Sequence, residues 1–322
     1  MYKEGLATAL ASIGKKTEPL AFGGDRLSIV WWNTSLSPYG GAKAKMGAAN
    51  KKKTIKSIIR LVEMNDLVVL GEYQDEHGLS KCLAEANLRL HNLGSGIRYD
   101  VFDLNYKCNY KAKNGRNCSH EFHNYLIYNT RSLINKTGSL KEATFNMLGK
   151  DHYRVFQRVR FYDNLMGLGD FELFIVHWSM HDGFEARAEA RRKEAAAERI
   201  VEQMGLDESA FPYQFVMGDF NCELYEEPFA KLKSSRSRGY STRNGTLYNP
   251  FWACMGDEIG TISHRDNDTF LCDAPFFDSV MVNHRIVSDA RGLRLHAKVL
   301  EDIEPFLADQ HHPLRLVIER KM

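Results

Sequence analysis

The sequence contains few cysteines and prolines and no long hydrophobic run. With six cysteines and eight prolines in 322 residues, the chain is neither a disulfide scaffold nor a proline-rich, low-complexity protein. No apolar stretch approaches the roughly 18 residues of a membrane-spanning helix. Residues 1–16 lack a strong apolar segment, so we do not expect a signal peptide. These features predict a cytoplasmic protein with free thiols and no membrane association.

The chain also lacks a strong charge of either sign. Its 43 Lys and Arg residues nearly balance its 41 Asp and Glu residues, which leaves a net charge of +2. Hydrophobic residues make up 43% of the chain and charged residues 26%, and these values are typical of a globular protein rather than a disordered one. Any basic surface that binds nucleic acid must therefore be local.

Short β-branched and aromatic runs alternate with stretches of helical character. Strands are predicted at 27–32, 67–70, 124–128, 153–161, 171–176, 214–217, 277–282 and 314–318. Residues 54–64 carry apolar side chains at helical spacing. The Ala-, Glu- and Arg-rich residues 183–204 favour a second helix, with an ion pair between Glu189 and Lys193 and with Gly205 as the C-cap. This pattern predicts one α/β domain over residues 26–322, preceded by an N-terminal extension, residues 1–25.

Polar residues stand where several of these strands begin or end, which is where ligand sites of α/β folds usually lie. Taken singly, each is more simply a turn former or a structural histidine. Together they supply carboxylates, amides and imidazoles, which are the side chains needed for metal-assisted hydrolysis of a phosphoester. The residues are Asn33, Glu72, His177, Asp219, Asn221, Asp278 and His311.

These residues lie in six motifs: WWN, DLVVLGE, FIVHWS, GDFN, FDSVMV and DQHHPL. In sequence and in order, the motifs resemble those of the endonuclease/exonuclease/phosphatase superfamily, typified by pancreatic deoxyribonuclease and the abasic-site endonucleases. GDFN is the most specific of the six, and the resemblance covers residues 27–318. It implies an α/β (α+β) fold of four layers, in which two packed mixed β-sheets are flanked by helices and the site lies at one end.

The resemblance also implies catalytic roles for five residues. Asp219 would orient or deprotonate the attacking water, and Asn221 would position the water and the phosphate. His177 would donate a hydrogen bond to the scissile phosphate. His311 would contact the phosphate or act as the general acid or base, and Asp278 would orient its imidazole.

A divalent cation, Mg²⁺ or Mn²⁺, is implied as the cofactor, with Asn33 and Glu72 as its ligands. Gly71 stands where the family often has Gln. Gln310 stands where the family has an Asp beside the terminal histidine, and it is the third candidate for metal contact. Because its amide carries no charge, we expect a lower affinity for Mg²⁺ and a preference for Mn²⁺. His312 is the alternative to its neighbour as the catalytic imidazole.

Two segments, 107–116 and 231–243, combine basic side chains with tyrosines. Such segments suit contact with a phosphate backbone and stacking on bases, although solvated surface loops often have the same composition. The second segment follows the GDFN motif, so we expect it near the site. The candidate nucleic-acid contacts are Lys111, Lys113, Lys231, Lys233, Arg236, Arg238 and Arg243.

A zinc site is a further possibility in the first basic segment. Cys108, Cys118, His120 and His123 could ligate a metal, but their spacing matches no standard zinc motif. A basic hairpin is the preferred interpretation.

The sequence therefore predicts a divalent-metal-dependent phosphodiester hydrolase, specifically a DNA endonuclease of low sequence specificity, with RNA not excluded as a partner. Two alternatives remain. One is a phosphatase or phosphodiesterase that acts on a small phosphorylated metabolite or a lipid headgroup. The other is a catalytically weakened protein that binds nucleic acid without cleaving it, an interpretation that only Gln310 supports.

Overall fold

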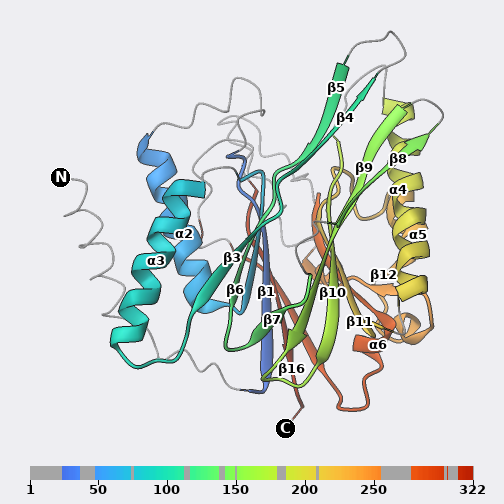
Figure 1. Ribbon diagram of the computed structural model, residues 1–322. Coiled ribbons are helices and arrows are strands. Elements are labelled where there is room, and N and C mark those ends of the chain that lie inside the picture. Colours follow the sequence, from blue (N-terminus) through green and yellow to red (C-terminus); the bar gives the residue numbers. More distant parts are fainter. Residues whose placement is uncertain are drawn as a thin grey trace, which may run out of the picture.

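Two mixed β-sheets pack against each other in the computed structural model of the protein (Figure 1). The residues that the structure describes are 24–36, 48–73, 76–111, 117–137, 142–148, 151–179, 186–207, 210–254, 277–300, 303 and 311–321. The proposed N-terminal extension lies almost entirely outside them.

The first sheet has six strands and contains the first and last strands of the chain. Its order is β15 (Arg294–Val299), β16 (Leu314–Glu319), β1 (Arg26–Asn33), β2 (Leu67–Gly71), β6 (Tyr125–Asn129) and β3 (Tyr99–Asp103). Strands β1 and β2 are parallel, and the other pairs are antiparallel.

The second sheet has eight strands, and its parallel pairs are β10 with β11 and the short β12 with β13. Its order is β12 (Ser234–Ser235), β13 (Leu247–Tyr248), β14 (Asp278–Asn283), β11 (Tyr213–Asp219), β10 (Gly169–His177), β9 (Asp151–Asp163) and β7 (Leu133–Asn135), with β8 (Glu142–Leu148) also paired to β9. A separate hairpin, β4 (Tyr106–Lys111) with β5 (Asn117–Phe122), projects beyond the sandwich (Figure 1).

Helices cover the outer face of each sheet, which completes the four layers that the sequence predicts (Figure 1). Helices α2 (Ala48–Met64) and α3 (Glu76–Asn92) flank the first sheet. Helices α4 (Ala186–Asp207) and α5 (Glu227–Lys231) flank the second. The remaining short helices are η3 (Tyr240–Thr242), η4 (Pro250–Cys254) and α6 (His284–Val287). No helix among the described residues is long and apolar enough to cross a membrane.

Side chains of β1 alternate between two hydrophobic clusters because successive residues of a strand point to opposite faces. Ile29 and Trp31 lie in the cluster between the two sheets. Val30 and Trp32 lie in the cluster beneath α2 and α3. All four are fully buried, so β1 is anchored on both faces and its C-terminal end is held firmly.

All eight predicted strands and both predicted helices are present, but two details of the second helix are wrong. Helix α4 continues to Asp207, so Gly205 lies inside it and does not cap it. Glu189 pairs with Arg192 at 2.7 Å rather than with Lys193. The Nζ of Lys193 instead donates to the backbone oxygen of Asn221, at the end of β11. The predicted ion pair is absent because Lys193 reaches the neighbouring sheet.

Candidate active site

Three of the predicted residues occupy one level of the second sheet. In the parallel pair β10–β11, His177 is in register with Asp219. In the antiparallel pair β11–β14, Asp219 is in register with Asp278. The buried hydrophobic runs before His177 and Asp219 set this register, because they place the polar ends of both parallel strands at the same edge.

The first sheet brings its own polar residues to the same end of the sandwich. Asn33 ends β1 in register with Gly71, the last residue of the parallel strand β2. Glu72 follows at once, with a positive φ of 49° that turns the chain out of the strand. Asn221 also has a positive φ, of 47°. Non-glycine residues rarely adopt this conformation, and it concentrates at functional sites.

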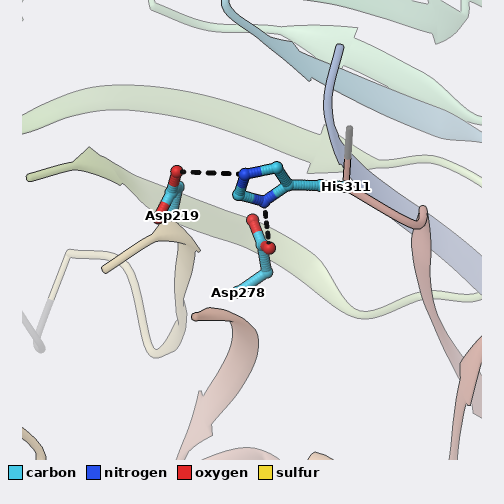
Figure 2. A group of neighbouring side chains, drawn as sticks. All are labelled: Asp219, Asp278 and His311. Atoms are coloured by element: carbon cyan, nitrogen blue, oxygen red, sulfur yellow. Dashed lines mark hydrogen bonds and ion pairs between the residues drawn. The ribbon is translucent and has the colours of Figure 1, made fainter. Parts of the chain in front are cut away.

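His311 is the centre of a buried chain of hydrogen-bonding groups (Figure 2). Its Nδ1 lies 2.5 Å from Oδ2 of Asp278, and its Nε2 lies 3.8 Å from Oδ2 of Asp219. None of the three side chains is more than 8% exposed. Asp278 therefore fixes the orientation of the ring, so that its other nitrogen points at Asp219.

A second imidazole approaches Asp219 from the other side. The Nε2 of His177 lies 3.3 Å from Oε1 of Glu72 and 3.9 Å from Oδ2 of Asp219. The amide of Asn33 donates to both carboxylates, at 2.9 Å to Asp219 and 3.4 Å to Glu72. The two sheets therefore contribute to one continuous polar cluster.

Asn221 is held by three contacts at the start of the loop after β11. Its backbone N–H donates to Oδ1 of Asp219 at 2.9 Å. Its side-chain amide donates to the backbone oxygen of Trp178 at 2.8 Å. Lys193 donates to its backbone oxygen. These contacts explain how a strained backbone conformation is retained at this position.

Burial and neighbouring charges raise the pKa values of some groups in this cluster and lower the pKa of another. Burial, with the charges of Asp278 and Glu72, raises the pKa of Asp219. Burial alone would lower the pKa of His311, but Asp278 and Asp219 raise it to about 9. Burial alone would raise the pKa of Glu72, but the hydrogen bond and charge of His177 lower it to about 2. At neutral pH His311 is thus an imidazolium and Glu72 a carboxylate.

Glu72 and Asn33 form the better place for a divalent cation. Ligand atoms of Asp219, Asp278 and His311 also lie within 4.8 Å of one another, but Asp278 already uses both oxygens in hydrogen bonds to His311 and Trp31. Glu72 is ionised and partly exposed. Carboxylate and amide oxygens, with room for water, are the ligands that Mg²⁺ prefers, so Glu72 fits the cation as it stands. Asn33 would fit it with its amide group turned, because its Oδ1 accepts the backbone N–H of Ser35 at 3.1 Å.

Arg154 of β9 is a neighbour of the cluster that the sequence did not single out. Its guanidinium is buried beside the charges of Glu72 and Asp219. It donates to the backbone oxygen of Glu121 at 3.1 Å and to the hydroxyl of Ser179 at 3.3 Å, while its Nε has no hydrogen-bond partner among the described residues. In the sequence it is one of three arginines on the same strand, and nothing distinguishes it from the others.

The segment 231–243 does not lie beside these residues, so that part of the prediction is wrong. Strand β12 belongs to this segment and pairs with β13. In β13, Leu247 is in register with Asn283, which is the last residue of β14, whereas Asp278 is the first. From Asp278 to Asn283 is roughly 17 Å at about 3.4 Å per residue. Sequence proximity to the GDFN motif misled the prediction because α5 and β12 carry the chain away to the far end of the sheet.

The five basic residues of this segment have different surroundings. Lys231 pairs with Glu198 of α4 at 3.0 Å. Arg238 donates to the backbone oxygen of Leu293 at 2.5 Å. The guanidinium of Arg243 lies 4.8 Å from the ring centroid of Tyr240. The side chains of Lys233, Arg236, Arg238 and Arg243 are exposed.

The first basic segment lies in the β4–β5 hairpin, which begins at the end of the sandwich that holds the polar cluster. Its base is tied there because the backbone N–H of Tyr73, next to Glu72, donates to the oxygen of His123 at 3.0 Å. Cys108 is a free thiol, and His123 pairs with Glu121 at 3.2 Å. The side chains of Lys111, Cys118 and His120 lie outside the described residues, as do Lys113 and Gln310 entirely.

Comparison with known proteins identifies the fold. No family model matches the chain, and no curated protein matches it in sequence. An endonuclease/exonuclease/phosphatase family protein from Bacteroides thetaiotaomicron is 13% identical, with a TM-score of 0.55 over 92% of this chain and 98% of that one. The human Nocturnin catalytic domain with bound sulfate is also 13% identical, with a TM-score of 0.52 over 93% and 95%.

TDP2 from D. rerio, complexed with a single-strand DNA product, is 10% identical, with a TM-score of 0.53 over 91% of this chain and 99% of that one. Identities this low show a shared fold alone.

Proposed function

We propose that this chain, which has the endonuclease/exonuclease/phosphatase fold, is a divalent-metal-dependent phosphodiester hydrolase and that its substrate is DNA. The observation that carries the proposal is the buried sequence of contacts from Asp278 through His311 to Asp219, with His177 approaching the same carboxylate. A structural role alone does not require two imidazoles and two carboxylates to converge at the open end of a sandwich.

Each residue of the cluster has a chemical task in this reaction. Asp219, whose pKa burial raises, is a stronger base than an exposed carboxylate and would take a proton from the attacking water. His311, protonated at neutral pH, would stabilise the charge that develops on the phosphate. His177 would donate to a phosphate oxygen. Asn221 would orient the water, because its own backbone is fixed to Asp219.

Glu72 and Asn33 would hold the cation. When bound, it would supply positive charge next to the phosphate oxygens. Arg154, buried behind Glu72 and Asp219, would keep these carboxylates ionised and close together when the substrate arrives.

Removal of the cation is expected to abolish cleavage. Purified protein should nick supercoiled plasmid with Mg²⁺ or Mn²⁺ and should be inactive in EDTA. The variant Glu72→Gln keeps the shape of the side chain but loses its charge, so the cation concentration for half-maximal activity should rise by at least about tenfold. Calorimetric titration with Mn²⁺ should show the same loss of affinity without any substrate.

Glu202→Gln is the matched control, because Glu202 is an exposed residue of α4. Its cation requirement should equal that of the wild type. Equal Mn²⁺ affinity in Glu72→Gln and the wild type would contradict the assignment of Glu72 as a ligand.

DNA is favoured as the substrate by the surroundings of the site. TDP2 from D. rerio, which shares this fold, is complexed with a single-strand DNA product. The β4–β5 hairpin rises from the catalytic end (Figure 1) and presents the exposed Tyr106 and Lys107, of which Lys107 forms an ion pair with Glu121. An aromatic ring and a cation next to the site suit stacking on a base and contact with a phosphate.

A small phosphorylated molecule is the second candidate, and the position of segment 231–243 favours it. With those cations at the far end, fewer basic side chains among the described residues surround the scissile group than DNA binding usually involves. Plasmid and a small aryl phosphate monoester should be compared under the same conditions. Turnover of the monoester without plasmid cleavage would overturn the assignment of DNA.

Segment 231–243 is expected to bind only DNA that is long enough to reach it. Replacing Lys233, Arg236 and Arg238 together with Gln should weaken binding of a 30-base-pair duplex, and the slope of log K against log salt should fall by about 2 to 3. A tetranucleotide, roughly 14 Å long, should bind and be cleaved as by the wild type. Fluorescence anisotropy over a range of salt concentrations measures the first effect.

The control is the same substitution at Lys53, Lys56 and Lys81, three exposed residues of α2 and α3. It removes equal charge from a different surface and should leave the slope unchanged. If the two triple variants behave alike, segment 231–243 is an ordinary solvated surface.

A further inference from the structure

Both oxygens of the Asp278 carboxylate accept hydrogen bonds. Oδ2 lies 2.5 Å from the imidazole of His311, and Oδ1 accepts the indole N–H of Trp31 at 2.7 Å. Asp278 and Trp31 are both 0% exposed. With one oxygen held by the indole and the other by the imidazole, the carboxylate resists rotation away from His311.

Trp32 holds the same histidine through its backbone. Its indole N–H donates to the carbonyl oxygen of His311 at 2.8 Å. The paired register of β1 with β16 ends at Trp31 and Leu314, three residues after His311. His311 thus lies beyond the end of this ladder, and the indole of Trp32 gives it a hydrogen bond to β1.

The two indoles reach the site from opposite faces of one strand. Trp31 belongs to the cluster between the sheets, and Trp32 to the cluster beneath α2 and α3. Space for the first indole depends on Gly71 of the neighbouring strand, because a Cβ there would lie 2.6 Å from Cη2 of Trp31. Gly71 and Trp31 are therefore complementary in shape.

We propose that Trp31 and Trp32 are positioning residues for the imidazole of His311, Trp31 through the carboxylate of Asp278 and Trp32 through the backbone of His311. Neither indole contacts the substrate in this scheme. Their effect is to hold the catalytic ring within the narrow range of positions that reaction requires, where a displacement of about 1 Å can cost about a hundredfold in rate. The kinetic part of the inference rests on the proposed hydrolase activity.

Trp31→Phe is the first test, because it removes the indole N–H and keeps an aromatic ring in the core. We expect kcat to fall by about tenfold or more, with KM nearly unchanged. In the Asp278→Asn background the same substitution should have little further effect, because the group that it positions has already been altered. An equal loss in both backgrounds would show that Trp31 acts only through stability, and would overturn the proposal.

Trp252→Phe is the matched control. Trp252 is half-buried in η4, and its indole nitrogen has no hydrogen-bond partner among the described residues. This variant should keep the kcat of the wild type. If Trp31→Phe does not fold, Trp32→Phe tests the proposal instead. It leaves the hydrogen bond from Trp31 to Asp278 in place, and it should still lower kcat; an unchanged kcat would overturn the proposal.

A measurement without substrate separates this inference from the proposed function. The proton between His311 and Asp278 should give a strongly downfield NMR resonance, identified by its absence in His311→Ala. In Trp31→Phe it should shift or broaden, and in Trp252→Phe it should not change. An unchanged resonance in Trp31→Phe overturns the positioning role, whereas a shifted resonance in a protein that cleaves no phosphoester supports positioning and overturns the hydrolase.

Discussion

Asp219→Ala and His311→Ala are each expected to lower the rate of phosphodiester cleavage by about 10²- to 10⁴-fold, which is the usual contribution of a positioned base or acid. Asp219 is the carboxylate on which both imidazoles and the Asn33 amide converge. Without it, the attacking water has no base, and the backbone of Asn221 loses its hydrogen-bond acceptor. Single-turnover cleavage of plasmid measures the loss.

The controls use the same residue types away from the site. Asp170 and His296 are exposed residues paired with Lys136 and Glu319, and their Ala variants should retain wild-type rates. Circular dichroism should show that all four variants are folded. Cleavage near the wild-type rate by a folded Asp219→Ala or His311→Ala would refute the assigned role of that residue.

Gly218→Ala is expected to destabilise the protein by at least about 3 kcal/mol or to prevent folding. Gly218, immediately before Asp219, has a φ of 144°, and an added Cβ would overlap the carbonyl oxygen of Val176 on the adjacent strand. Both atoms of this clash belong to the backbone or are attached directly to it, so no side-chain rotation can relieve it. Urea unfolding, followed by fluorescence, measures the difference.

Gly205→Ala is the companion variant and should stabilise the protein, whereas Gly218→Ala should destabilise it. Gly205 lies inside α4, and a Cβ there would meet no atom within 4 Å. Alanine in a helix interior is more stable than glycine by about 0.5–1 kcal/mol. Equal unfolding midpoints for Gly218→Ala and the wild type would show that the backbone at the GDFN motif is not constrained as described.

The sequence predicted the elements of the fold because the central strands contain continuous apolar runs, as in residues 67–70 and 215–217. It also predicted the basic hairpin of β4 and β5, but it did not predict the edge strand β15. The residues of β15, RLHAKV, alternate between polar and apolar, which is a strand pattern that the sequence prediction overlooked. Helix α3 was also missed, although Leu79, Leu83, Ala86 and Leu90 stand at helical spacing.

For the site, the residues at the ends of the predicted strands could be identified from sequence. Their contacts could not, because they depend on register between strands that are far apart in the chain. Asp219 and Asp278 face each other across β11 and β14. The roles of Arg154, Trp31 and Trp32 were invisible for the same reason: an arginine in a strand and two tryptophans before an Asn indicate only burial until the partner of each polar atom is known.

The cluster is divided between the two sheets: Asn33 and Glu72 come from one, and His177, Asp219 and Asp278 from the other. A folding intermediate in which only one sheet has formed would therefore carry only part of the proposed catalytic set. Bringing Glu72 and Asp219 together also opposes the docking of the sheets, because like charges repel. A bound cation would offset that repulsion. It would therefore stabilise the interface between the two sheets, and only after both sheets have folded.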